Sequence, residues 1–229
     1  MIMIFGYSKL SAELVYRLKK EKKDFIIIEP DEKYLKFAKA DNDINNIYDY
    51  ECYDDAELIS LGIKDKISTL FCMHNDFNKN LLVTLSARNL NKNMQIISYC
   101  TDNNDSKKLK LAGASITINP HETAGLKIFR QIHKPMAVKI LDDILYKNTS
   151  LDIQEIKISK TCSLNGVRSD SLKDISEYKL ILLGIQDKEI SNDFIFSSRG
   201  INHRIDENDI IVVLGKKEDI ARFKKKVLI

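Results

Sequence analysis

The first twenty residues constrain the fold of this chain more than any other stretch. Met1–Phe5 are five consecutive apolar residues, which is typical of a buried strand, and Gly6-Tyr7-Ser8 follows as a short turn. Apolar residues then recur at helical spacing from Leu10 to Leu18, and Lys19 and Lys20 stand in the last turn of the expected helix. A strand, a tight turn and a helix in this order begin a doubly wound nucleotide-binding unit.

This turn is a candidate anion site. The hydroxyl of Ser8 can cap the helix that follows. The backbone N–H groups of Ser8 to Leu10 and the positive end of the helix dipole can then hold a phosphate or another anion, with Lys9 nearby. The alternative is an ordinary strand–helix turn without a ligand, and the sequence leaves both interpretations open.

The same alternation continues to residue 119. Short apolar runs predict further strands at Phe25–Ile28, Asn45–Tyr48, Ser68–Met73, Gln95–Tyr99 and Ser115–Ile118. Helical segments lie between them at Asp31–Ala40, Asp54–Leu61, Phe77–Leu90 and Asp105–Leu111. Within Phe77–Leu90 we expect the leucines to face inward, namely Leu81, Leu82, Leu85 and Leu90. Continuous apolar strands that alternate with helices predict an α/β fold, a parallel sheet covered on both faces.

The pattern changes after residue 119. Two helical segments, Thr123–Ile132 and Met136–Tyr146, precede a polar stretch at Lys147–Ser150 that is the best boundary candidate. The remaining residues predict a small α+β lobe. Its strands are expected at Leu151–Ser159, Lys179–Gln186 and Asp209–Leu214, and its helices at Leu172–Ile175 and Lys217–Lys226.

Composition excludes several function classes. The chain has 36 basic and 33 acidic residues and a net charge of +3, so we expect no nucleic-acid partner. No apolar run reaches the ~20 residues that span a bilayer, and we expect a soluble, intracellular protein. The four cysteines form no CxxC pair, so Cys72 and Cys100 are interpreted as reduced core thiols and no metal site is expected.

The order and spacing of several strings resemble the RCK/KTN domains, the regulators of potassium conductance and uptake. Gly6–Ser11 stands at the family's Gly-x-Gly-x-x-Gly turn, and Glu29 stands at its acidic residue after strand two. Further strings similar to the family are Asp54–Ile63, Asn80-Leu81-Leu82, Ala87–Asn91, Leu109–Ala114, Asn119-Pro120, Leu164–Val167 and Asp209–Gly215. The resemblance covers nearly the whole chain.

The resemblance implies an organisation and a function. It implies a Rossmann-like lobe at 1–119, a helix-turn-helix dimerisation segment at 120–148 and a regulatory C-terminal lobe at 149–229. It also implies homodimers that clasp through Thr123–Tyr146, often joined into an octameric ring under a potassium pore. Such a protein is cytoplasmic, at the inner face of the membrane, and it gates the pore when a ligand changes the clasp.

Departures from the family pattern concern the ligand. The second and third glycines of the turn are Ser8 and Ser11, and Tyr50-Glu51 replaces a Gly-Asp pair, so a bulky Tyr is expected to narrow the cleft. The ligand is therefore left open: a nucleotide of the NAD, ATP/ADP or AMP type, or none. Domains fused to channels lose these glycines more often, which favours a channel domain. The alternatives are a free peripheral subunit of a potassium uptake transporter and a nucleotide-dependent oxidoreductase.

The candidate binding residues gather at strand ends. They are Gly6, Tyr7, Ser8, Lys9 and Leu10 in the turn, Glu29 for ribose hydroxyls, Glu51 after strand three and His74 after strand four. Each has a structural alternative: Glu29 as a solvated strand-end carboxylate, for example, or His74 as a loop histidine. We expect Asp76 to cap a helix rather than bind a cation. The acidic stretch Asp41–Asp55 is interpreted as solvated surface, and no catalytic constellation is found.

Overall fold

The computed structural model describes residues 1–40, 44, 46–52, 54–145, 150–169, 173–187, 194–197 and 203–228. Some predicted features fall on other residues and lie outside the described part of the chain. They are the strand start at Asn45, the acidic Asp41 and Asp43, the helix end at Tyr146, the polar boundary at 147–149 and the helix start at Leu172. The chain divides into two compact units, Met1–Ile128 and Phe129–Ile229.

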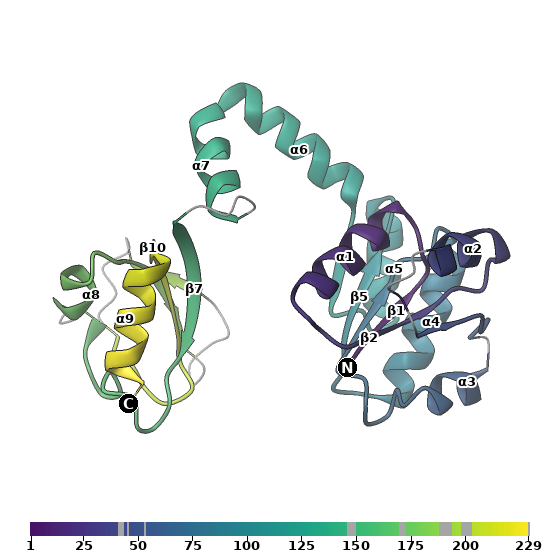
Figure 1. Ribbon diagram of the computed structural model, residues 1–229, viewed down its shortest axis with the longest axis horizontal. Coiled ribbons are helices and arrows are strands. Elements are labelled where there is room, and N and C mark those ends of the chain that lie inside the picture. Colours follow the sequence, from purple (N-terminus) through teal and green to yellow (C-terminus); the bar gives the residue numbers. More distant parts are fainter. Residues whose placement is uncertain are drawn as a thin grey trace. The chain divides into compact units, whose positions relative to one another are not determined.

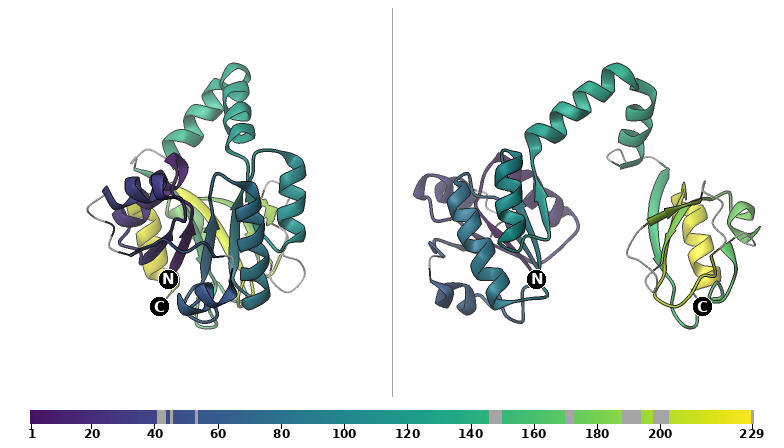
Figure 2. Two further views of the ribbon diagram at one scale, coloured as in Figure 1. Left: turned by 90° about the vertical axis from the view of Figure 1, so that its right-hand side faces the viewer. Right: turned by 180° about the vertical axis from the view of Figure 1, so that it is seen from behind.

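The first unit is built on a parallel sheet of six strands in the order β3-β2-β1-β4-β5-β6. Its strands are β1 Ile2–Phe5, β2 Phe25–Ile28, β3 Ile47–Tyr48, β4 Thr69–Cys72, β5 Gln95–Tyr99 and β6 Ile116–Ile118. Its helices are α1 Lys9–Lys20, α2 Glu32–Ala40, α3 Asp55–Ser60, α4 Phe77–Leu90 and α5 Asn103–Leu111, followed by α6 Pro120–His133, which extends into the second unit. Figures 1 and 2 show helices on both faces of this sheet. The predicted doubly wound fold is confirmed.

Alternate residues of β1 point to opposite faces and build two separate cores. Met3 and Phe5 belong to one core, together with Leu58 of α3 and Val83 of α4. Ile4 belongs to the other, which α1 covers with side chains such as Val15 and Leu18. Because neighbouring strands in a covered parallel sheet are buried on both faces, their sequences read as continuous apolar runs.

Helix α4 corrects one sequence prediction. Leu82 and Leu85 were expected to face inward, but their side chains are 36% and 55% exposed. The buried face of α4 carries smaller and polar residues instead: Asn80, Val83, Thr84 and Ala87. Two of these polar groups find partners, because Asn80 bonds the backbone of His74 and the Thr84 hydroxyl lies 2.8 Å from that of Ser98. Partnered polar groups can be buried at little cost.

The second unit contains an antiparallel sheet in the order β7-β10-β8-β9. Its elements are α7 Pro135–Leu145, β7 Leu151–Lys157, α8 Lys173–Glu177, β8 Ile181–Gln186, β9 Phe194–Phe196, β10 Ile210–Lys216 and α9 Lys217–Val227. Helix α9 packs on β7 and β10 and buries Ile220 and Phe223 against them. The predicted α+β lobe is confirmed, with β9 as a strand that the sequence did not reveal.

Helices α6 and α7 carry exposed apolar side chains in the described part of the chain. Helix α6 buries none of its 14 residues. Exposed apolar side chains on the two helices are Leu126, Ile128, Phe129, Ile132, Met136, Ile140 and Leu141. An apolar face of this extent is typical of a protein–protein contact. Among the described residues, no helix combines the length and apolar content that crossing a bilayer demands.

Candidate functional site

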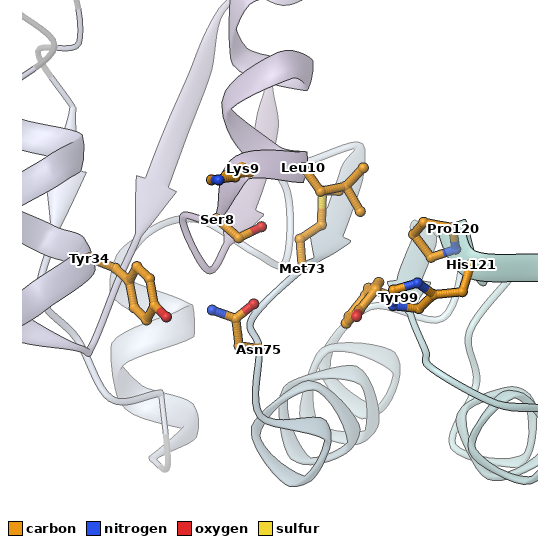
Figure 3. Close-up of a pocket in the computed structure, with 9 residues that line it drawn as sticks. All are labelled: Ser8, Lys9, Leu10, Tyr34, Met73, Asn75, Tyr99, Pro120 and His121. Carbon is orange, nitrogen blue, oxygen red and sulfur yellow. The ribbon is translucent and has the colours of Figure 1, made fainter. Parts of the chain in front are cut away.

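A pocket of about 400 Å³ lies at the carboxyl edge of the six-stranded sheet. The sheet order places β1 beside β4, where the chain switches from building one side of the sheet to building the other. Ligands of doubly wound folds bind in the crevice at this switch point. The lining residues, drawn in Figure 3, are Ser8, Lys9, Leu10, Tyr34, Met73, Asn75, Tyr99, Pro120 and His121.

The turn after β1 requires a glycine at position 6. Gly6 has a φ of +94°, in the left-handed region that side chains disfavour. A Cβ at Gly6 would lie 2.3 Å from both the backbone N and the Cα of His74, far inside van der Waals contact. The turn after β1 therefore packs directly against the segment that follows β4. These two segments contribute neighbouring parts of the pocket wall.

Ser8 and Ser11 cap helix α1 as a reciprocal pair. The Ser8 N–H donates to the Ser11 Oγ at 2.6 Å, and the Ser11 N–H donates to the Ser8 Oγ at 3.5 Å. The N–H groups of Lys9 and Leu10 belong to the first helical turn, where no intrahelical acceptor exists. The two serines thus cap the helix N-terminus and occupy space that glycines leave open in a dinucleotide fingerprint, and the Ser8 N–H that was expected to face an anion is bound within the cap.

Glu29 is turned toward the turn rather than toward the pocket. Its side chain is 1% exposed, and its carboxylate accepts hydrogen bonds from the N–H groups of Tyr7 at 2.5 Å and Asp31 at 2.8 Å. Burial raises the pKa of Glu29, although the two N–H donors act in the opposite direction. The role expected for Glu29 at ribose hydroxyls would require this buried carboxylate to become accessible, although its two oxygens can still accept further hydrogen bonds.

His74 is a buried loop residue behind the turn. Its Nδ1 accepts the N–H of Asp76 at 2.9 Å, so in the neutral ring the proton is on Nε2. That Nε2 is buried without a hydrogen-bond partner among the described residues and lies 3.7 Å from Glu29 Oε1. Asn80 holds the backbone of His74 through both its N–H and its carbonyl. Burial is the main cause that lowers the pKa of His74, and Lys79 adds to it.

The lowered pKa of His74 predicts a pH dependence of stability. Below pH 6.5, the usual pKa of histidine, the unfolded chain takes up a proton that the native protein refuses until the pH falls further. The free energy of unfolding should therefore decrease as the pH falls through this window. Chemical denaturation from about pH 8 to about pH 5 should give a shallower decrease for His74→Gln than for the wild type. Parallel curves for the two proteins would contradict this assignment.

The other expected site residues lie apart from the pocket lining. Glu51 is exposed and forms an ion pair with Lys79 at 3.1 Å. Tyr50 packs against the core beneath the sheet rather than into the pocket, so it does not narrow the cleft as expected. Asp76 caps α4 by accepting the N–H groups of Asn78 and Lys79, as predicted.

Sequence reasoning missed most of the lining residues outside the turn. Asn75 follows β4 and Tyr99 ends β5, so the rule that ligands bind at carboxyl ends of strands could have found both. Tyr34 and His121 come from α2 and α6. They depend on where those helices pack, which the sequence alone does not specify.

Comparison with known proteins agrees with this doubly wound domain. The sequence pattern of the TrkA-N domain family matches residues 2–120. Potassium channel protein 1 of Methanocaldococcus jannaschii is 24% identical over 226 residues, which are 98% of this chain and 66% of that protein. The chain thus spans less than the full length of this relative.

Solved structures share the fold at low identity. The human SLO3 gating ring superposes with a TM-score of 0.68 at 13% identity, over 97% of this chain and 46% of that one. A structure described as the GsuK channel bound to NAD has a TM-score of 0.51 at 16% identity, over 98% of this chain and 38% of that one. The chain belongs to the TrkA-N domain family, and the predicted resemblance to RCK domains is confirmed.

Proposed function

We propose that this chain is a ligand-sensing regulatory domain that gates a potassium channel. The observation that carries the proposal is the pocket at the α1 turn of a TrkA-N domain, a lined cavity at the place where such folds bind ligands. The similarity of 98% of the chain to part of a potassium channel protein supports the choice of a channel. The domain acts on the cytoplasmic side of the membrane and has no catalytic role.

The ligand that fits this pocket is an anion with a flat ring system. The helix N-terminus and Lys9 supply positive potential, Tyr34 and Tyr99 supply aromatic surface, and none of the nine lining residues is acidic. A nucleotide meets these requirements. NAD, ATP, ADP and AMP are therefore the compounds to test. Because Glu29 is buried and is not among the lining residues, the pocket does not rely on it to read ribose hydroxyls.

The signal leaves the pocket through the helix pair. Pro120 and His121 line the pocket and begin α6, whose apolar side chains are uncovered. In this proposal the lobe 1–119 senses, the segment 120–148 clasps a second subunit, and the lobe 149–229 completes the regulatory unit. Dimers then join into an octameric ring. A ligand shifts gating only if it binds one clasp geometry more tightly than the other.

Two alternatives predict different observations. A free peripheral subunit of a potassium uptake transporter would be encoded without a pore, whereas a channel domain would follow two membrane helices that flank a selectivity filter in the same gene. A nucleotide-dependent oxidoreductase would turn over a nicotinamide cofactor. A positive result in a spectroscopic assay for that turnover would favour the oxidoreductase.

Substitution of Ser8 tests the ligand site. Aspartate, asparagine and serine are comparable helix N-caps, so Ser8→Asp and Ser8→Asn should both fold. The aspartate repels a phosphate at this turn, and we expect at least roughly tenfold weaker nucleotide binding. In a thermal-shift panel of NAD, ATP, ADP and AMP, a stabilising nucleotide should act on the wild type and Ser8→Asn but not on Ser8→Asp.

Two outcomes would count against the site. If no nucleotide stabilises the wild type, the pocket is not a nucleotide sensor. If Ser8→Asp binds as tightly as Ser8→Asn, nucleotides bind elsewhere on the protein.

A further inference from the structure

Three metal-binding side chains meet in the second unit, far along the chain from the nucleotide pocket. They are Asp187, directly after β8, His203, and Asp209, directly before β10. One ligand atom from each lies within 4.8 Å of the other two. Imidazole nitrogen and carboxylate oxygen are common ligands of zinc and of related divalent ions.

The register of the sheet places the two carboxylates opposite one another. Strands β8 and β10 are antiparallel, and Ile210 pairs with Gln186. One step further along this register, Asp209 faces Asp187. Their side chains are 0% and 2% exposed. Like charges directly opposite one another destabilise a sheet, and a cation bound between the two carboxylates would remove that repulsion.

His203 lies between the two carboxylates and at the outlet to solvent. Its Nδ1 is 3.4 Å from Asp187 Oδ2, and its Nε2 is 2.9 Å from Asp209 Oδ2. The His203 side chain is 15% exposed, so it has the most contact with solvent of the three. The backbone of His203 is fixed, because its N–H donates to the Ser169 hydroxyl at 3.0 Å and its carbonyl accepts the Ser169 N–H at 2.8 Å.

Hydrogen bonds also fix the backbone and the side chain of Asp209. Its carbonyl accepts the Ile158 N–H at 2.8 Å, and its Oδ2 accepts the Asp206 N–H at 2.9 Å. Ligands on rigid elements with fixed backbones are what a preorganised metal site requires. Asp187 and Asp209 flank paired strands, and the imidazole, which lies between their carboxylates, has to turn so that one of its nitrogens faces the ion.

We propose that Asp187, His203 and Asp209 bind one divalent transition-metal ion of the zinc type. One imidazole nitrogen and one oxygen from each carboxylate would bind the ion at about 2.0–2.2 Å, and the fourth position would face solvent. Calcium is a poor fit, since it takes six to eight oxygen ligands and three protein ligands with a nitrogen among them supply too few. The ion neutralises both buried carboxylates and ties His203 to the end of β8.

Metal titration of the full chain tests this site. After treatment with EDTA and its removal, Zn²⁺ should bind at one equivalent in calorimetry and raise the melting temperature. Asp187→Asn, His203→Gln and Asp209→Asn each remove a ligand. Each should lower the affinity for Zn²⁺ by more than the roughly 10–100-fold that is typical of losing a group that only orients a ligand. Asp206→Asn is the matched control, because Asp206 contacts Asp209 through its backbone N–H and carbonyl, which the substitution keeps.

Cobalt gives a readout that needs no variant to fold. Co²⁺ bound to the wild type should give the visible absorption of a four-coordinate ion, and Zn²⁺ should displace it. His203→Cys should add a thiolate-to-cobalt charge-transfer band. Absence of saturable Co²⁺ and Zn²⁺ binding by the wild type would overturn the proposal. Undiminished binding by folded Asp187→Asn and Asp209→Asn would overturn it too.

Discussion

Replacing Gly6 by alanine should destabilise the first unit by about 3 kcal/mol. A left-handed backbone costs a residue with a side chain about 1–2 kcal/mol, and forcing extra atoms into a packed region adds about 1–3 kcal/mol. The added methyl group would lie 2.3 Å from the backbone N and Cα of His74, so backbone rather than a flexible side chain must move. Denaturant unfolding of the wild type and Gly6→Ala measures the difference.

Gly125→Ala is the matched control for Gly6→Ala. Gly125 lies within α6, and a Cβ there meets no atom within 4 Å. Alanine in a helix interior is more stable than glycine by roughly 0.5–1 kcal/mol, so this variant should be unchanged or slightly stabilised. Equal stabilities of Gly6→Ala and the wild type would show that the turn does not pack on the segment after β4 as described.

Replacing Ile140 by glutamate should dissociate the proposed dimer. The Ile140 side chain is 53% exposed on α7, among the apolar residues that the chain leaves uncovered. Losing a central apolar contact costs about 2 kcal/mol or more, and a symmetric interface contains each substitution twice. The dissociation constant should therefore rise by at least roughly 100-fold. Light scattering coupled to size-exclusion chromatography should show a dimer for the wild type and a monomer for Ile140→Glu.

Lys139→Glu tests whether the effect is specific to the apolar face. Lys139 is exposed beside Ile140 and is already charged, so its replacement should leave the dimer intact. A wild type that is monomeric at all concentrations would refute the clasp. An Ile140→Glu variant with the mass of the wild-type dimer would place the subunit contact elsewhere.

The first unit could be predicted well from sequence because its signals are local. A continuous apolar run gives β2 its bounds, and the cap at Asp76 gives α4 its start. Other features depend on packing. The sequence predicted that Leu82 and Leu85 are core residues, but the buried face of α4 carries Asn80 and Ala87 instead. Hydrophobicity alone does not show that a polar residue such as Asn80 has found a partner.

In the candidate site, too, some features could be predicted from the sequence and others could not. The turn Gly6–Leu10 was predictable, because the glycine, the capping serine and the helix period are consecutive in the sequence. The orientation of Glu29 was not, since it depends on donors from Tyr7 and Asp31 that become available only in the folded turn. The cluster around His203 was also missed. Its members are brought together by strand register, and Asp187 and Asp209 are 22 residues apart in the printed sequence.

Ligand binding at the α1 turn is proposed to change the geometry of the subunit clasp. A spin label at Lys139→Cys would report on it, because all four native cysteines are buried and should react slowly. The distance between the two labels of a dimer should be measured by pulsed electron paramagnetic resonance, with and without the nucleotide that stabilises the protein most. We expect a shifted distance distribution at saturation, and no shift when Ser8→Asp is present as well. An identical distribution with nucleotide demonstrably bound would contradict it.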